Sequence, residues 1–246
     1  MTPDDLLAVF NAAADAARDA LAPLKGAARR ARTERPGQYA LDLVADAAVL
    51  PILHDAGVAV VSEESGRSGP VDAAVTVVLD PVDGSTNCSR DIPYWSISLC
   101  ALDADGPLCA LVVNQATGVS TTAVRGKGAW RHGEPVAPSA VTRVEDAVVS
   151  FSGTPQRRLP WQQLRSLGSA ALELCDVATG ALDAYLTSWQ APWDYLGGVL
   201  VCREAGATVV DAHGGELVST DPDTRRQLVG ASTPELLEAV RGALPA

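Results

Sequence analysis

The order of polar and apolar residues predicts an amphipathic helix at the N-terminus. Thr2 suits the N-cap and Pro3 the first helical position, and the acids that follow suit the positive end of a helix dipole. Apolar residues then recur at helical spacing as far as Leu21. After a Pro-Gly break, a second helix is expected at about 41–55, because apolar residues again follow the helical period.

Short apolar runs bounded by turn residues predict the strands of a sheet. The expected strands are 58–61, 75–79, 97–102, 108–113, 148–151 and 208–210. Further helices are expected at about 159–166, 170–178, 195–205 and 234–243. This order of elements favours a layered α/β fold. We expect a single domain over 1–246, in which two subdomains, about 1–145 and about 146–246, are a further division.

Composition excludes several classes of protein. With 47% hydrophobic and 20% charged residues the chain is not disordered, and a net charge of −11 disfavours a nucleic-acid partner. No uncharged apolar run reaches the length of a membrane span, and acids interrupt the N-terminal apolar stretch, so neither a membrane protein nor a signal peptide is expected. Five cysteines without a C-x-x-C pair indicate a reducing compartment, which favours a cytoplasmic protein without a thiolate zinc site.

The densest chemical signal is a pair of carboxylates at the end of the expected strand 75–79. Asp80 and Asp83 flank Pro81, and Gly84 permits a sharp turn. Carboxylates at the carboxyl end of a strand face the crevice where open α/β sheets bind ligands. Oxygen ligands without a neighbouring His or Cys favour Mg²⁺. The alternative interpretation is an Asp-rich turn that caps a helix.

A second acidic pair, Glu63-Glu64, follows the expected strand 58–61. Two such pairs at the ends of neighbouring strands can converge on one site, although like charges near 4 Å repel by about 4 kcal/mol at an effective dielectric constant of 20. A divalent cation between them would offset this repulsion. A solvated turn is the alternative interpretation of this pair.

The third signal is Trp193-Asp194, placed ahead of an expected helix that contains Gly197 and Gly198. Each glycine costs about 1 kcal/mol relative to alanine inside a helix, so another element is expected to approach this helix closely. The alternative interpretation is an N-cap aspartate followed by glycines that serve packing alone.

Taken together, these motifs resemble the inositol monophosphatase family of Mg²⁺-dependent, lithium-sensitive phosphatases. The matching segments are Ser62-Glu63-Glu64-Ser65, Asp80-Pro81-Val82-Asp83-Gly84-Ser85-Thr86-Asn87, Leu167-Gly168-Ser169-Ala170-Ala171, Trp193-Asp194 and Glu204-Ala205-Gly206. They occur in order and cover roughly residues 40–240.

The resemblance implies an αβαβα layered sandwich of the inositol monophosphatase and fructose-bisphosphatase type. It implies two or three Mg²⁺ ions, with Mn²⁺ as a substitute. The implied metal ligands are Glu63, Asp80, the Val82 carbonyl, Asp83 and Asp194. It also implies that Glu63, Ser85 and Asp46 hold the attacking water, with no covalent phosphoenzyme. The implied substrate-binding residues are Asp83, Gly84, Ser85, Gly168, Ser169, Ala170, Thr187 and Asp194.

The chain departs from the family pattern at several of these positions. The motif ahead of the glutamate pair is two residues shorter and lacks a threonine, so either Asp42 or Asp46 can face the site, since both lie on one helix face. Gln38 stands in the stretch where the family often has a lysine. Thr187 occupies the place of the glutamate that contacts sugar hydroxyls in members that act on inositol, and Cys88 that of a frequent aromatic residue.

The sequence therefore predicts a phosphomonoesterase for a small phosphorylated metabolite, most directly inositol monophosphate or a related polyol or sugar phosphate. A 3′-phosphonucleotide or histidinol-phosphate phosphatase is the alternative within the superfamily. A non-catalytic regulatory binding protein on the same fold is the alternative of another class. We further expect a homodimer, whose buried face the strands 97–102 and 108–113 supply.

Overall fold

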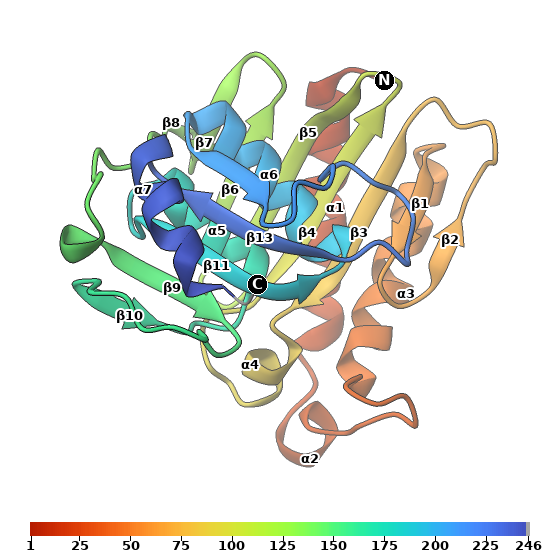
Figure 1. The fold of residues 1–246 in the computed structure, drawn as a ribbon. Coiled ribbons are helices and arrows are strands. Elements are labelled where there is room, and N and C mark those ends of the chain that lie inside the picture. Colours follow the sequence, from red (N-terminus) through yellow and green to blue (C-terminus); the bar gives the residue numbers. More distant parts are fainter. Residues whose placement is uncertain (245–246) are drawn as a thin grey trace.

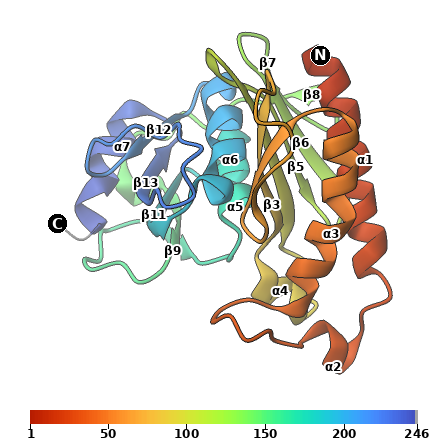
Figure 2. The same ribbon diagram turned by 90° about the vertical axis from the view of Figure 1, so that its right-hand side faces the viewer.

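The computed structural model describes residues 1–244, and they form five layers. In Figure 2 the layers follow one another as two helices, a large sheet, two helices, a small sheet and a final helix. The fold is the layered α/β sandwich expected from the sequence. Hydrophobic side chains fill the spaces between the layers in three clusters.

The first layer consists of the N-terminal helices. Helix α1 (Pro3–Leu21) begins with a capping box in which Thr2 and Asp5 exchange hydrogen bonds, so the predicted helix start is confirmed. A short helix, α2 (Gly26–Arg29), and a loop lead to α3 (Ala40–Asp55). The apolar stripes of α1 and α3 pack on the large sheet.

The large sheet has eight strands in the order β2-β1-β3-β4-β5-β6-β7-β8. The strands are β1 (Ala59–Ser62), β2 (Gly66–Ser68), β3 (Thr76–Asp83), β4 (Ser96–Asp103), β5 (Gly106–Asn114), β6 (Val119–Val124), β7 (Gly128–Arg131) and β8 (Glu134–Pro135). Only β1 and β3 pair in parallel, and the other neighbours are antiparallel. A five-residue helix, α4 (Ser85–Ser89), connects β3 to β4.

The middle layer lies between the two sheets and consists of α5 (Ala170–Ala178) and α6 (Pro192–Ala205). The glycine pair of α6 allows close packing on both sides, as the sequence led us to expect. A Cβ at Gly197 would lie 2.7 Å from the Ser98 hydroxyl of β4, and one at Gly198 would lie 2.5 Å from the Leu174 Cβ of α5. Gly197 therefore allows α6 to lie close to the large sheet, and Gly198 allows it to lie close to α5.

The small sheet has five strands in the order β10-β9-β11-β13-β12, and α7 (Pro234–Val240) covers its outer face. Its strands are β9 (Val148–Ser152), β10 (Gln163–Arg165), β11 (Ala184–Gln190), β12 (Thr208–Asp211) and β13 (Arg226–Ala231). Two short 3₁₀ helices, Val144–Asp146 and Arg241–Ala243, complete the described chain.

Two expectations from the sequence are wrong. The segment 159–166 contains no helix, because residues 163–165 pair with β9 as the exposed edge strand β10. The strands 97–102 and 108–113 correspond to β4 and β5, which are interior strands, nearly all buried, with α1 and α6 packed against them. They are therefore not free to form a face between two protomers.

Among residues 1–244, none of the helices is both long and apolar enough to cross a membrane.

Candidate active site

The register of the large sheet places two of the predicted carboxylates side by side. Ser62, the last residue of β1, lies opposite Leu79 of β3, and the Glu63 amide donates to the Leu79 carbonyl at 3.1 Å. Glu63 therefore follows β1 at the level where Asp80 lies in β3. The parallel pairing that the sequence could only suggest brings the two motifs to one edge of the sheet.

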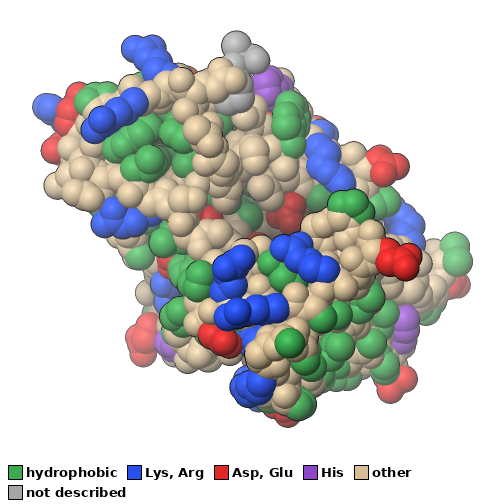
Figure 3. All heavy atoms as spheres, turned by 90° about the horizontal axis from the view of Figure 1, so that it is seen from below, with side chains coloured by type: hydrophobic (Ala, Val, Ile, Leu, Met, Phe, Trp, Pro, Cys, Tyr) green, Lys and Arg blue, Asp and Glu red, His purple; other side chains and the backbone are tan. Residues whose placement is uncertain are grey.

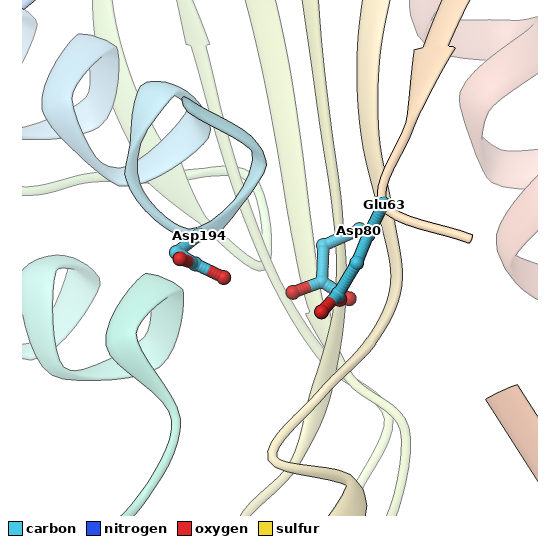
Figure 4. Close-up of side chains that lie close together, drawn as sticks. All are labelled: Glu63, Asp80 and Asp194. Atoms are coloured by element: carbon cyan, nitrogen blue, oxygen red, sulfur yellow. The ribbon is translucent and has the colours of Figure 1, made fainter. Parts of the chain in front are cut away.

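The third carboxylate comes from α6 in the middle layer. Asp194 lies in the first turn of this helix, where its carboxylate accepts a hydrogen bond from the Ala191 amide at 2.7 Å. One carboxylate oxygen from each of Glu63, Asp80 and Asp194 lies within 4.8 Å of the other two. Figure 4 shows Glu63 and Asp80 next to each other, with Asp194 reaching toward them from α6. We call these three residues the acidic cluster.

The electrostatics of the acidic cluster disfavour three bare negative charges. Burial, followed by the charges of Asp194 and Glu64, raises the pKa of Glu63 to about 9. Burial, followed by the charge of Asp83, raises the pKa of Asp194 to about 7, and burial raises that of Asp80 well above its ordinary value. Within residues 1–244, no basic side chain forms an ion pair with any of the three. A divalent cation with hard oxygen ligands fits this donor set.

Asp83 lies next to the acidic cluster but binds the start of α5. Its carboxylate accepts hydrogen bonds from the Ser169 hydroxyl and from the amides of Ala170 (3.1 Å) and Ala171 (2.8 Å). Burial raises the pKa of Asp83 to about 6, although these hydrogen bonds act in the opposite direction. Ser169 and Ala170, which the resemblance implies as substrate-binding residues, therefore hold a carboxylate in this structure.

A tight contact joins the turn at Gly84, which follows Asp83, to the loop at Gly168, which precedes α5. Gly84 has φ of +91°, and a Cβ there would lie 2.8 Å from the Gly168 carbonyl. A side chain at position 84 would separate the turn after Asp83 from the loop before α5. The structure thus brings together the predicted segments around Gly84 and Gly168, which are 84 residues apart.

Ser85 lies at the start of α4, where its hydroxyl donates to the Val82 carbonyl at 2.9 Å. Asp42 is the carboxylate beside it: the Ser85 hydroxyl is among the groups that lower the Asp42 pKa, against the larger effect of burial, which raises it. One oxygen of Asp42, Oδ1, is buried and has no hydrogen-bond partner among the described residues. Asp46 has a different partner, since it accepts a hydrogen bond from the Ser62 hydroxyl.

The structure does not bring Thr187 to the surface of the site. Thr187 is fully buried in β11, and its hydroxyl accepts the Leu228 amide of β13 at 2.8 Å. Trp189, two residues further on, is 58% exposed and stacks on His213 with ring centroids 5.2 Å apart.

Two arginines near the site were missed from the sequence. Arg225 lies 5.6 Å above the Trp193 ring, and its charge lowers the pKa of the adjacent Asp194, although burial raises that pKa more. Arg35 pairs with Glu64 at 3.5 Å. Neither arginine belongs to a motif, and both lie in loops. The one signal in the sequence that could have pointed to them is a positive charge in an acidic protein.

Cys88 is not a candidate nucleophile. Its side chain is buried, and burial raises the pKa of the thiol to about 12 despite the nearby Arg29 charge. A thiol with this pKa is protonated near neutral pH, whereas the nucleophilic form is the thiolate. Arg29 donates hydrogen bonds to the Cys88 carbonyl and sulfur, which indicates a structural role.

Comparison with known proteins supports this interpretation of the geometry. Residues 5–244 match the model of the inositol monophosphatase family. The fructose-1,6-bisphosphatase/inositol-1-monophosphatase of Archaeoglobus fulgidus is 36% identical over 215 residues, which are 82% of this chain and 83% of that protein. Inositol monophosphatase 1 of Solanum lycopersicum is 31% identical over 200 residues, or 74% of this chain and 71% of that protein.

The fold is likewise found among solved structures. A protein of Pyrococcus horikoshii, described as similar to inositol-1 monophosphatase, superposes with a TM-score of 0.89 at 27% identity and covers 100% of both chains. The full-length superposition shows that all five layers are shared with that protein.

Proposed function

We propose, from the premise that this chain belongs to the inositol monophosphatase family and is a phosphatase for phosphate monoesters, that it hydrolyses a small phosphorylated polyol or sugar with the help of Mg²⁺. The observation that carries this proposal is the acidic cluster, in which three carboxylates converge without a basic partner among the described residues. Such a cluster is costly without a cation, so its presence supports catalysis over a purely regulatory role.

Glu63, Asp80 and Asp194 would hold the cation, and Asp83 and the Val82 carbonyl are the further candidate ligands for a second or third ion. When bound, Mg²⁺ supplies positive charge that stabilises the phosphate and its leaving oxygen and acidifies water. The protein's own contribution is to fix the carboxylates: Glu63 and Asp80 by the pairing of β1 with β3, and Asp194 by the buried helix α6.

Ser85 and Asp42 are our candidates for orienting the attacking water. In this structure the Ser85 hydroxyl donates to the Val82 carbonyl. The Ser85 hydroxyl also lies beside Asp42, whose buried Oδ1 has no hydrogen-bond partner among the described residues, so Asp42 is the alternative acceptor for the Ser85 proton. A hydroxyl that donates its proton to Asp42 can accept a hydrogen bond from the attacking water. The hydrogen bond orients this water so that a lone pair of the water oxygen points at phosphorus. We therefore assign to Asp42 the role that the shortened motif left open between Asp42 and Asp46.

Inositol monophosphate and fructose 1,6-bisphosphate are the leading substrates, because the A. fulgidus relative is named for both activities. Thr187 is buried and gives a leaving group no carboxylate contact, which supports a broader range of polyol phosphates rather than strict selection of inositol.

The test is phosphate release with and without Mg²⁺ from myo-inositol 1-phosphate, fructose 1,6-bisphosphate, 3′-phosphoadenosine 5′-phosphate and histidinol phosphate. We expect release from the first two to exceed that from the others, and EDTA to abolish all of it. Preference for the nucleotide or for histidinol phosphate would identify the alternative phosphatase. No release from any substrate, or full activity in metal-free buffer, would contradict the proposal.

We also propose that the protein works in the cytoplasm as a homodimer. All five cysteines are unpaired and buried, which is compatible with a reducing compartment. With β4 and β5 excluded, the interface must use other surfaces. Light scattering should return about twice the 25.4 kDa of one chain.

A further inference from the structure

A small basic cavity lies beside the active site and has no role in the proposed reaction. Its volume is about 150 Å³, and it is lined by Arg30, Arg32, Tyr39, Ser89 and Arg90. These residues follow α2 or lie at the end of α4, on the underside of the molecule in Figure 1. Figure 3 looks at this face, where Lys and Arg side chains gather next to the hollow between the two halves.

The three arginines of this cavity have no ion-pair partner among the described residues. Among residues 1–244, none of Arg30, Arg32 and Arg90 forms an ion pair, whereas their neighbours Arg29 and Arg35 pair with acids at 3.2 and 3.5 Å. Guanidinium groups remain charged at any physiological pH, so they cannot relieve their mutual repulsion by losing a proton. In a protein with a net charge of −11, three unpaired cations around one cavity indicate a place for an anion.

The cavity is held in shape before any ligand enters. Arg32 donates to the Tyr39 hydroxyl at 2.7 Å and to the Gly37 carbonyl at 3.1 Å. Tyr39 is buried, and its hydroxyl also lies 3.3 Å from the Thr86 hydroxyl. Hydrogen bonds from Ser89 and Thr86, and then the charges of Arg32 and Arg90, lower the pKa of Tyr39, which agrees with a positive field in the cavity. A preformed site loses less conformational entropy on binding.

Size and lining select the class of ligand. The volume equals that of about five water molecules in the liquid, which is room for a phosphoryl group. The lining supplies two hydroxyl groups and three guanidinium groups, which match tetrahedral oxygen anions, and it offers little apolar surface. We propose that this cavity binds a phosphate group, as free phosphate or as the phosphoryl end of a phosphorylated metabolite, separately from the acidic cluster.

The bound anion would be linked to the catalytic side chains through Tyr39. The Tyr39 amide donates to Asp42 at 2.8 Å, and Thr86, which lies against the Tyr39 hydroxyl, directly follows Ser85. The cavity therefore lies on the side of the active site that Ser85 and Asp42 form. This is the side from which the attacking water approaches in the proposed function. A second phosphate of the substrate would point with the leaving group to the opposite side, so the cavity is a site for a separate ligand.

The binding experiment uses metal-free protein in EDTA, because the acidic cluster without a cation repels anions and leaves the basic cavity as the phosphate site. Calorimetric titration with inorganic phosphate should show one saturable site whose affinity falls as salt is added. The double variant Arg30→Gln/Arg90→Gln should bind at least about tenfold more weakly. Both side chains are exposed, so the variant should fold, and its melting temperature without phosphate checks this. The exposed Arg143, which pairs with Glu145 and Asp146, gives the control Arg143→Gln, with unchanged binding.

A parallel titration with glycerol 2-phosphate identifies the source of the phosphate group. Equal affinity for both ligands would assign the cavity to free phosphate, and tighter binding of the ester would assign it to a phosphorylated metabolite. The absence of saturable binding up to roughly 10 mM phosphate, or equal affinity in the wild type and the double variant, would overturn the proposal. Because no turnover is measured, these outcomes are independent of whether the proposed substrate is correct.

Discussion

Two kinds of buried or half-buried carboxylate occur in this molecule, and they differ in the groups that face them. In the small sheet, Asp211 accepts the amides of Gly215 at 2.8 Å and Gln227 at 3.0 Å, one for each oxygen. In the acidic cluster, Asp80 and Asp194 each accept one amide, Glu63 accepts none from the described residues, and the remaining oxygens face one another. Burial alone therefore does not distinguish the acidic cluster from Asp211; the shortage of hydrogen-bond donors does.

Neutralising one acid of each kind should give the sharpest contrast. Asp80→Asn should lower turnover by about 10³-fold, because the charge contributed by a bound cation is worth several kcal/mol in the transition state. It should not destabilise the metal-free protein, since it removes a repelling charge. Asp211→Asn should leave turnover nearly unchanged but lower the melting temperature, since an amide group would meet a main-chain donor. Equal losses of turnover in both variants would remove the distinction.

Within the site, removal of the Ser85 hydroxyl and removal of the Cys88 thiol should also have very different effects on kcat. Ser85→Ala should lower kcat by about 10²-fold with little change in KM, as expected for a contact made mainly in the transition state. Ser85→Thr should remain active, and Cys88→Ala should stay within about twofold of the wild type, because the thiol is protonated and buried. A kcat that is kept in Ser85→Ala but lost in Cys88→Ala would require a thiol mechanism.

The two aspartates of α3 allow a finer comparison. Asp42→Asn keeps an acceptor for the Tyr39 amide but weakens the acceptor for Ser85, so kcat should fall about tenfold. Asp46→Asn keeps an acceptor for the Ser62 hydroxyl, and we expect less than about a threefold change. Steady-state kinetics of the pair decides between them, and the reverse order of effects would return the role to Asp46.

The smallest expected effect is a pH dependence of stability. The pKa values of Glu63 and Asp194 are raised, to about 9 and about 7, so the folded metal-free protein binds protons that the unfolded chain releases. The stability this gives is present below the ordinary carboxyl pKa and is lost as the pH rises through 7 to 9. The melting temperature in EDTA should therefore fall by about 5 °C between pH 6 and 9.

Added Mg²⁺ should recover more of the melting temperature at the higher pH, because it binds the deprotonated carboxylates. Asp80→Asn should flatten both trends, since it removes one of the repelling charges. A melting temperature in EDTA that is independent of pH would mean that the carboxylates of the acidic cluster do not have raised pKa values.

Much of the fold and of the chemistry was predictable because the signals are local. The cap at Thr2, the helix over 41–55, the strand that precedes Glu63 and the strand that contains Asp80 each depend on residues within a few positions. For the site, the motif around Asp80 contains its own turn, and the pairing of β1 with β3 places Glu63 beside it.

What the sequence did not predict depends on partners far along the chain. Both Asp42 and Asp46 lie on the inner face of α3, and only the packing of that helix on the sheet decides which one meets Ser85. The segment 159–166 has apolar residues at helical intervals, yet pairing with β9 makes part of it a strand. The buried place of Thr187 likewise follows from its bond to Leu228, 41 residues away.

The contact between Asp83 and the start of α5 has a consequence for the order of folding. Asp83, whose side chain caps α5, is synthesised 86 residues before Ser169. Asp194 is synthesised later than both. Closing loops of this length costs entropy before any contact repays it, so these contacts form late on the folding path. A nascent chain that ends before α6 carries all eight strands of the large sheet but neither a finished middle layer nor a complete acidic cluster. The acidic cluster is therefore completed only when the last third of the protein has joined the first.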